Sequence, residues 1–197
     1  MNPKTPPLEE SEKSEDPDRV RLGTILGVGA LVVGGLLVWA LVPGGRAGRQ
    51  APVDDPFNGA RLVSLERAGE MVEAVGHPVF WAGRLPGMRV AMNEDSRQNV
   101  HVRYLPDGVD PETSSNQYFT VGSYPFSQAF EATSRLAGEP GRAPVEFPGG
   151  VGFLDRMRGD RLVLSFRGHP DLQVEVFHPR LGRALEAVRT GGIVPMP

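Results

Sequence analysis

The sequence contains no cysteine and almost no lysine. Without cysteine the chain has no disulfide, no zinc–thiolate site, no iron–sulfur cluster and no cysteine nucleophile. The two lysines are Lys4 and Lys13, and every later cation is arginine, which we interpret as the codon preference of a GC-rich genome. The net charge of −3 over 197 residues does not suit a nucleic-acid-binding surface, and we expect no nucleic-acid partner.

One long segment, residues 22–42, carries no charge at all. As a helix it would be about 31 Å long, which matches the hydrocarbon core of a bilayer at about 30 Å. Trp39 lies near its end, where an aromatic residue suits the membrane interface. Arg21 precedes the segment and Pro43 follows it. The sequence therefore predicts a single-pass transmembrane helix and a lipid bilayer as its partner.

The same segment could instead be a cleaved export signal. Such a signal has an apolar region of about 7–15 residues and small residues at its cleavage site. Here the apolar run is longer, and residues 40–43 read Ala-Leu-Val-Pro, so we favour a retained signal-anchor. Gly23 with Gly27, and Ala30 with Gly34, have the small-xxx-small spacing that lets helices approach closely. This spacing is consistent with self-association or with an envelope protein partner.

These observations divide the chain into four parts. Residues 1–21 are polar and are expected to form a disordered cytoplasmic tail, 22–42 to cross the membrane, 43–56 to form a linker, and 57–197 to form an extracytoplasmic domain. The orientation rests on a weak bias, because four cations precede the span and three follow it.

The domain is predicted to be α+β, with about seven mostly antiparallel strands and three helices in the order α-ββββ-α-βββ-α. Ser64 and Gly76 suit the two ends of a helix over 64–75. A second helix is expected from Pro125 to Ala137, with Phe126, Phe130, Thr133 and Ala137 on one face, and a third from about Pro179 to the Gly191-Gly192 pair. The strands are expected at 78–83, 88–92, 99–105, 117–124, 150–157, 161–168 and 172–178. The segment between 138 and 149 is expected to be a connector rich in proline and glycine.

The strands alternate between apolar and polar residues. In 99–105, for example, Val100, Val102 and Tyr104 are expected to point inward, and His101 and Arg103 outward. The outward positions supply candidate ligand-binding residues, which are Arg89, His101, Arg103, Arg167 and Glu175. The alternative is an ordinary solvated face, as antiparallel sheets commonly have.

No motif of catalysis or metal binding is present. No Gly-x-Ser-x-Gly elbow occurs, and the glycine-rich stretch 149–152 is followed by no lysine, so we interpret it as a turn. The four histidines lack the spacing of metal ligands. Asp107, Asp110 and Glu112 fit a calcium loop poorly. We therefore expect no metal and no cofactor.

Four stretches, "GHPVFWAGRLPGM", "VHVRYLPDGV", "YFTVGSYP" and "QVEVFHP", carry a resemblance. Together they resemble a group of uncharacterised single-pass membrane proteins of actinobacteria, which share the Pro-Val-Phe/Tyr-Trp-Ala-Gly and Gln-Val-Glu-Val strands. The resemblance covers the predicted membrane helix and most of 62–195. It implies a bacterial cell-envelope setting, and it implies no activity because the group has none established.

Three functions remain open. The first is a membrane-anchored extracytoplasmic binding or interaction module, which the lack of a catalytic constellation favours. The second is an envelope-associated hydrolase in which His101 acts with acidic partners. The third is a structural subunit of a membrane complex that docks through the glycine-bearing helix.

Overall fold

The computed structural model describes residues 59–113, 117–155 and 161–197. The predicted tail, membrane helix and linker, residues 1–56, lie outside the described residues. Within the described ranges, no helix is long and apolar enough to span a bilayer.

Ten strands and three helices form the described part of the chain. The helices are α1 (Leu65–Val75), α2 (Ala129–Ala137) and α3 (Leu181–Arg189). The main sheet contains β1 (Arg61–Leu62), β3 (Arg89–Glu94), β4 (Val100–Leu105), β5 (Phe119–Pro125), β6 (Arg142–Phe147), β7 (Gly150–Asp155), β8 (Arg161–Phe166) and β9 (His169–Phe177). A small second sheet pairs β2 (Phe80–Trp81) with β10 (Val194–Pro195). The predicted α+β class, the three helices and the antiparallel sheet are confirmed.

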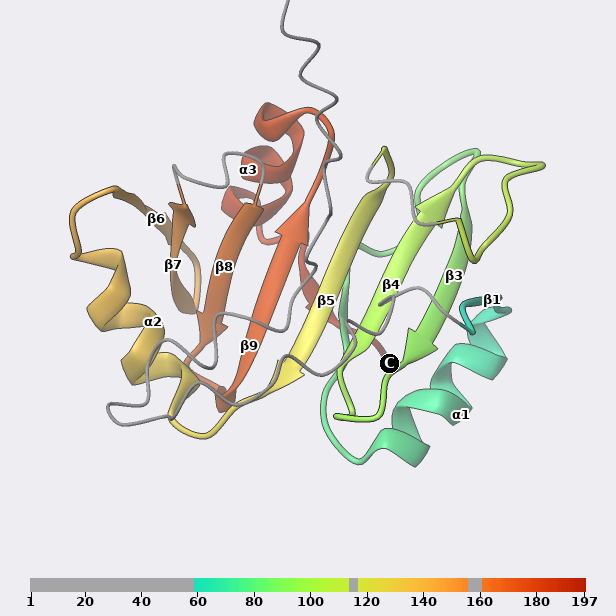
Figure 1. Cartoon of the computed structure of the whole chain (residues 1–197), viewed down its shortest axis with the longest axis horizontal. Helices are drawn as coiled ribbons and strands as arrows, with labels where there is room; N and C mark the ends of the chain where they lie inside the picture. Colours follow the sequence, from blue (N-terminus) through green and yellow to red (C-terminus); the bar gives the residue numbers. More distant parts are fainter. Residues whose placement is uncertain (1–58, 114–116, 156–160) are drawn as a thin grey trace, which may run out of the picture. The chain divides into compact units, whose positions relative to one another are not determined.

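The main sheet joins two meanders, in the order β1-β3-β4-β5-β9-β8-β7-β6. All of its strand pairs are antiparallel. β5 and β9 lie side by side at its centre, where the first meander meets the second (Figure 1). The predicted hairpin of β3 and β4 is present, and the Asp95 carboxylate accepts hydrogen bonds from the backbone N–H groups of Arg97 and Asn99 in its turn.

One side of this sheet, the apolar face, carries valines and leucines. Val102 pairs with Val121, Val121 with Val176, and Leu164 with Val174, so these side chains share one side of the pleat. They form the main core with residues of α1, α3 and β2 and with Ile193 and Met196, which flank β10. Both ends of α1 are as predicted: the Ser64 hydroxyl accepts a hydrogen bond from the Arg67 N–H, and Gly76 has a φ of 75°.

The opposite side, the polar face, is covered over β7 and β8 by α2. Leu136 packs there on Phe153 and Val163, and the hydroxyls of Thr133 and Ser165 are 2.9 Å apart. In Figure 1, α2 and α3 lie near opposite ends of the strands that they cover.

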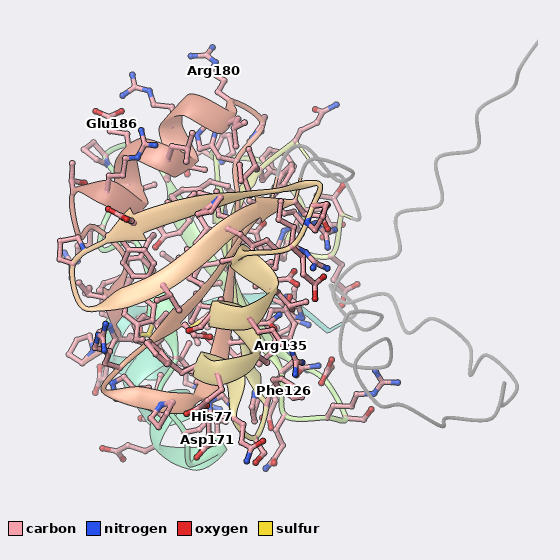
Figure 2. All side chains as sticks on the ribbon, turned by 90° about the vertical axis from the view of Figure 1, so that its left-hand side faces the viewer. His77, Phe126, Arg135, Asp171, Arg180 and Glu186 are labelled. Atoms are coloured by element: carbon pink, nitrogen blue, oxygen red, sulfur yellow. The ribbon has the colours of Figure 1, made fainter. Side chains whose placement is uncertain are left out.

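The start of α2 differs from the prediction. Pro125 is the last residue of β5 and pairs with Leu172, so the helix begins only at Ala129. Asp171, near the start of β9, fixes this start of α2 because its carboxylate accepts the Gln128 N–H at 2.7 Å. Figure 2 shows Asp171 and Phe126 together at this end, away from Arg180 and Glu186 of α3.

The buried face of α2 was therefore predicted only in part. Ala129, Thr133 and Leu136 are its buried residues, and the expected Phe130 is only half-buried.

Three strands were not predicted: β1, β6 and β10. β6 lies in the segment expected to be a connector, because Pro144 argues against a strand. Its place at the edge of the sheet explains the discrepancy, since an edge strand tolerates a residue without an N–H group. β1 and β10 have two residues each and so carry no periodic pattern.

Candidate functional site

The predicted site residues His101 and Glu175 lie in one row across the polar face. His101 pairs with Gly122, and Gly122 pairs with Glu175 on the next strand. The Tyr124 side chain folds over Gly122, where a Cβ atom would lie 2.5 Å from the Tyr124 hydroxyl. Glycine at this position thus lets the Tyr124 ring lie between the histidine and the carboxylate. The ring meets His101 edge-on at 5.6 Å between centroids.

Glu175 is the acceptor at the centre of this row. Its carboxylate lies 3.5 Å from donor groups of Tyr124, Arg161 and Gln173. Burial and the neighbouring negative charge of Glu175 raise the pKa of Tyr124 well above its ordinary value, so the phenol stays protonated. This group of residues neutralises a charge inside the fold.

His101 is held in the neutral form by its surroundings. Its pKa is lowered to about 4, chiefly by burial and also by Arg103 and Arg161, while Asp95 acts in the opposite direction. An imidazole with so low a pKa is a weak base near pH 7. This environment does not favour the general-base role that a hydrolase would require of His101.

The guanidinium groups of Arg89 and Arg103 hold the loop after β4. Arg103 donates to the carbonyl oxygens of Pro111 and Thr113 at 3.0 and 2.7 Å. Arg89 donates to the carbonyl oxygen of Pro106 at 3.2 Å and forms an ion pair with Asp107 at 3.1 Å. Both arginines therefore hold a segment of this chain in place.

Arg167 is separate from the other four predicted residues. It lies in the turn between β8 and β9, and its guanidinium stands 5.3 Å from the centre of the Phe130 ring on α2. The structure thus brings together His101 and Glu175, directs the guanidinium groups of Arg89 and Arg103 to the loop after β4, and places that of Arg167 beside α2.

The alternative of an ordinary solvated face is wrong for three of the five candidate residues, whereas Arg167 is exposed and Arg89 is half-buried. His101, Arg103 and Glu175 are only 2%, 0% and 5% exposed. Their polar atoms contact other parts of the chain, which alternation within single strands does not reveal. Their role in binding a ligand stays a prediction.

The apolar face contains a cavity of about 370 Å³, which we call the phenylalanine cavity. It lies between the small β2–β10 sheet, α3 and the turns that follow β6 and β8. Its inner wall is formed by Phe80, Phe147, Leu164, Phe166, Val188 and Ile193, with His169 beside them. Its rim is formed by exposed residues, which are Pro148, Gly149, Gly168, Gly191, Val194 and Pro195.

Four aromatic side chains form a continuous row along this wall. Phe147 meets Phe166 at 5.2 Å between centroids, Phe166 stacks on Phe80 at 4.3 Å, and Phe80 meets His169 at 5.6 Å. No lining residue carries a permanent charge, and the His169 imidazole is the one ionisable side chain among them. The cavity therefore suits an uncharged, largely apolar group.

Two glycines of β7 make room for the Phe147 ring. A Cβ atom on Gly150 would lie 2.3 Å from the ring, and one on Gly152 would lie 3.4 Å from it. Both glycines are on the apolar face, because Gly152 pairs with Leu164 and Gly150 with Phe166. The stretch 149–152 is thus a turn followed by a strand whose glycines shape the cavity wall.

Polar groups of the main sheet fix the small sheet over the cavity. The Phe80 N–H donates to the Ser123 hydroxyl at 2.9 Å, and the Ala82 N–H donates to the Tyr104 hydroxyl at 2.7 Å. The Met196 N–H donates to the carbonyl oxygen of Val79 at 2.7 Å. These bonds hold both strands of the small sheet in a fixed position.

No family model, curated protein or solved structure significantly matches this chain. Within the ranges that the structure describes, no group of three or more acidic or histidine side chains is placed to hold a metal ion. The sequence interpretation missed the phenylalanine cavity. Its signal was the alternate glycines Gly150 and Gly152 in a predicted strand, which mark the close approach of another group.

Proposed function

We propose that this chain is a membrane-anchored extracytoplasmic binding module of a bacterial cell envelope, and that its ligand places an uncharged, largely apolar group in the phenylalanine cavity. The observation that carries the proposal is the cavity itself. Its volume of about 370 Å³ falls within the range of small-molecule sites, which is roughly 300–1,000 Å³. Its wall is aromatic and aliphatic, with His169 as a polar group that could orient the ligand.

The membrane anchor rests on the sequence. Residues 22–42 are uncharged and long enough to span a bilayer, and the resemblance to single-pass actinobacterial proteins agrees with that reading. The weak excess of cations before the span supports an extracytoplasmic domain.

Binding fits the cavity better than hydrolysis does. The cavity lining contains one histidine and no carboxylate, so His169 has no acidic partner there. The alternative base, His101, lies on the opposite face of the sheet. General acid–base catalysis needs its groups within reach of one substrate atom.

Thiol labelling of the full chain in intact cells, with any outer barrier permeabilised, tests the topology. The natural protein has no cysteine, so Ser127→Cys gives one exposed labelling site in the domain and Ser14→Cys gives one in the tail. We expect a membrane-impermeant maleimide to modify Ser127→Cys before lysis and Ser14→Cys only after it. The reverse pattern would invert the proposed orientation. Ser123→Cys, at a buried position, should react only after denaturation and reports that the domain is folded.

Photolabelling tests binding at the cavity. The full chain in lipid nanodiscs is irradiated with the soluble, uncharged probe benzophenone-4-carboxamide, and the labelled peptides are identified by mass spectrometry. We expect adducts on the cavity wall, and we expect Val194→Trp at the rim to reduce them about tenfold. Met88→Trp is the matched control, since Met88 is 43% exposed, as Val194 is at 41%, but lies outside the lining. Equal labelling of both variants would contradict a binding role for this cavity.

A further inference from the structure

The lining of the phenylalanine cavity restricts the part of the ligand that enters it. A charged group buried there would need an opposite charge, and the lining offers none. The polar group available is His169, at one end of the row of rings. The buried part of the ligand is therefore hydrocarbon or close to it.

The arrangement of the rings favours a long group over a compact one. Phe147, Phe166 and Phe80 follow one another in contact along the wall, and Leu164 and Val188 add aliphatic surface. A flexible chain of methylene groups can contact such a row along its length. The rim consists mostly of glycine and proline together with the exposed Val194, so an apolar chain meets no charged side chain among the lining residues as it enters.

The predicted linker would keep this cavity close to the bilayer, whose lipids carry such chains of methylene groups. Residues 43–58 separate the predicted membrane helix from the first described residue, Gly59. These sixteen residues reach at most about 55 Å when fully extended. The domain would therefore stay near the bilayer surface on whichever side of the membrane it lies.

We infer that the phenylalanine cavity takes up the acyl chain of a bilayer lipid. This inference rests on the proposed function and names its ligand. The acyl chain enters between Val194 and Gly168 and lies along the row of rings. The headgroup of the lipid stays outside the uncharged lining.

A photoactivatable lipid tests the inference directly. The full chain is reconstituted into vesicles of phosphatidylethanolamine and phosphatidylglycerol that contain a small fraction of phosphatidylglycerol with a diazirine at the end of one acyl chain. After irradiation, adducts are mapped by mass spectrometry. We expect them in peptides that contain 164–169 and 188–195, in addition to the predicted membrane segment 22–42.

Variants at the rim separate cavity binding from general contact with the membrane. Val194→Trp should reduce the cavity adducts about tenfold, and those on 22–42 should stay constant and serve as the internal standard. Gly168→Phe provides a second obstruction, because a Cβ atom there meets nothing within 4 Å and the fold should tolerate it. Met88→Trp should label like the natural protein.

Two results would overturn the inference. Lipid adducts confined to 22–42 would exclude uptake of an acyl chain by the cavity. If both rim variants left the adducts on the cavity peptides unchanged, those adducts would not come from an acyl chain that enters through this rim. The benzophenone probe distinguishes this failure from failure of the binding module. If that probe labels the cavity and the lipid does not, the module stands and its ligand is a different apolar molecule. If neither labels the cavity, both proposals fall.

Discussion

The apolar face of the sheet surrounds a cavity of about 370 Å³ with uncharged rings, whereas the polar face buries an ion pair and a neutral histidine. On the polar face, Tyr124 occupies the space above Gly122 and Glu175 lies near three donors. On the apolar face, Gly150 and Gly152 make room for a ring that forms one wall of a hollow. The contrast teaches that buried charge is neutralised within the fold on one face, and that the hollow lies on the other face, where no lining residue carries a permanent charge.

Removing the central acceptor of the polar face should have the largest effect on stability. Glu175→Leu leaves Arg161, Tyr124 and Gln173 without this carboxylate, and we expect a loss of about 3 kcal/mol in the free energy of unfolding. Urea unfolding of the full chain in detergent, followed by Trp81 fluorescence in a Trp39→Phe background, measures it. Glu175→Gln, which keeps an acceptor oxygen, should cost less. Equal losses would show that the retained acceptor oxygen contributes nothing and that the lost charge accounts for the whole effect.

Lowering the pH should weaken the polar face and leave the apolar face unchanged. The pKa of His101 is about 4 in the folded protein against an ordinary 6.5, so the unfolded chain binds the proton more readily between these values. The stability contributed by the neutral histidine is complete above pH 6.5 and is lost as the pH falls toward 4. At pH 5 this loss should be about 2 kcal/mol relative to pH 8. His101→Gln should flatten that part of the profile, and an unchanged profile would contradict the assignment.

Filling the space beside Phe147 should strain the apolar face. We expect Gly150→Ala to cost about 2 kcal/mol, because the new methyl group would lie 2.3 Å from the Phe147 ring and 2.6 Å from the Ser165 carbonyl oxygen. The same variant should reduce benzophenone labelling of the cavity, since it displaces one wall. Gly168→Ala is the control, because its methyl group meets nothing within 4 Å. Similar unfolding midpoints for the two variants would contradict the close packing of Phe147.

The smallest effect concerns the bonds between the main sheet and the small one. Ser123→Ala removes the acceptor of the Phe80 N–H group in β2, and Tyr104→Phe removes the acceptor of the Ala82 N–H group just after it. Each should cost about 1 kcal/mol. Hydrogen exchange of the Phe80 and Ala82 amides should accelerate in the corresponding variant, while the amides of β4 stay protected. Unchanged exchange at both amides would show that β2 is held by its apolar contacts alone.

The sequence predicted the elements that local chemistry defines. Ser64 and Gly76 mark the two ends of α1 by their own capping preferences, and alternation along β4 correctly separated Val102 from Arg103. The pairing of β3 with β4 followed from their short turn. These features depend on residues close together in the chain.

The remaining features depend on distant segments. His101 and Arg103 were correctly placed on the polar side, but their burial depends on contacts outside their own strand, such as the loop that Arg103 holds. Likewise, the phenylalanine cavity requires Val194 to pair with Trp81. A two-residue strand such as β10 leaves no periodicity to detect, so this pairing could not be predicted, and Gly150 and Gly152 indicate only one wall of the cavity.

The central pairing of β5 with β9 has a kinetic consequence. β3, β4 and β5 pair in the order in which they follow one another in the chain, as do β6, β7, β8 and β9, whereas Thr120 pairs with Phe177, more than fifty positions later. Closing so long a loop is entropically costly, and contacts of this kind slow folding. During synthesis the N-terminal part of the protein emerges first, so the first meander would form early. The edge of β5 would then stay unpaired until β9 has been synthesised. During that interval Val121 and the unpaired backbone groups of β5 are open to wrong partners, so docking of the two meanders is the step at which this fold is most vulnerable to aggregation.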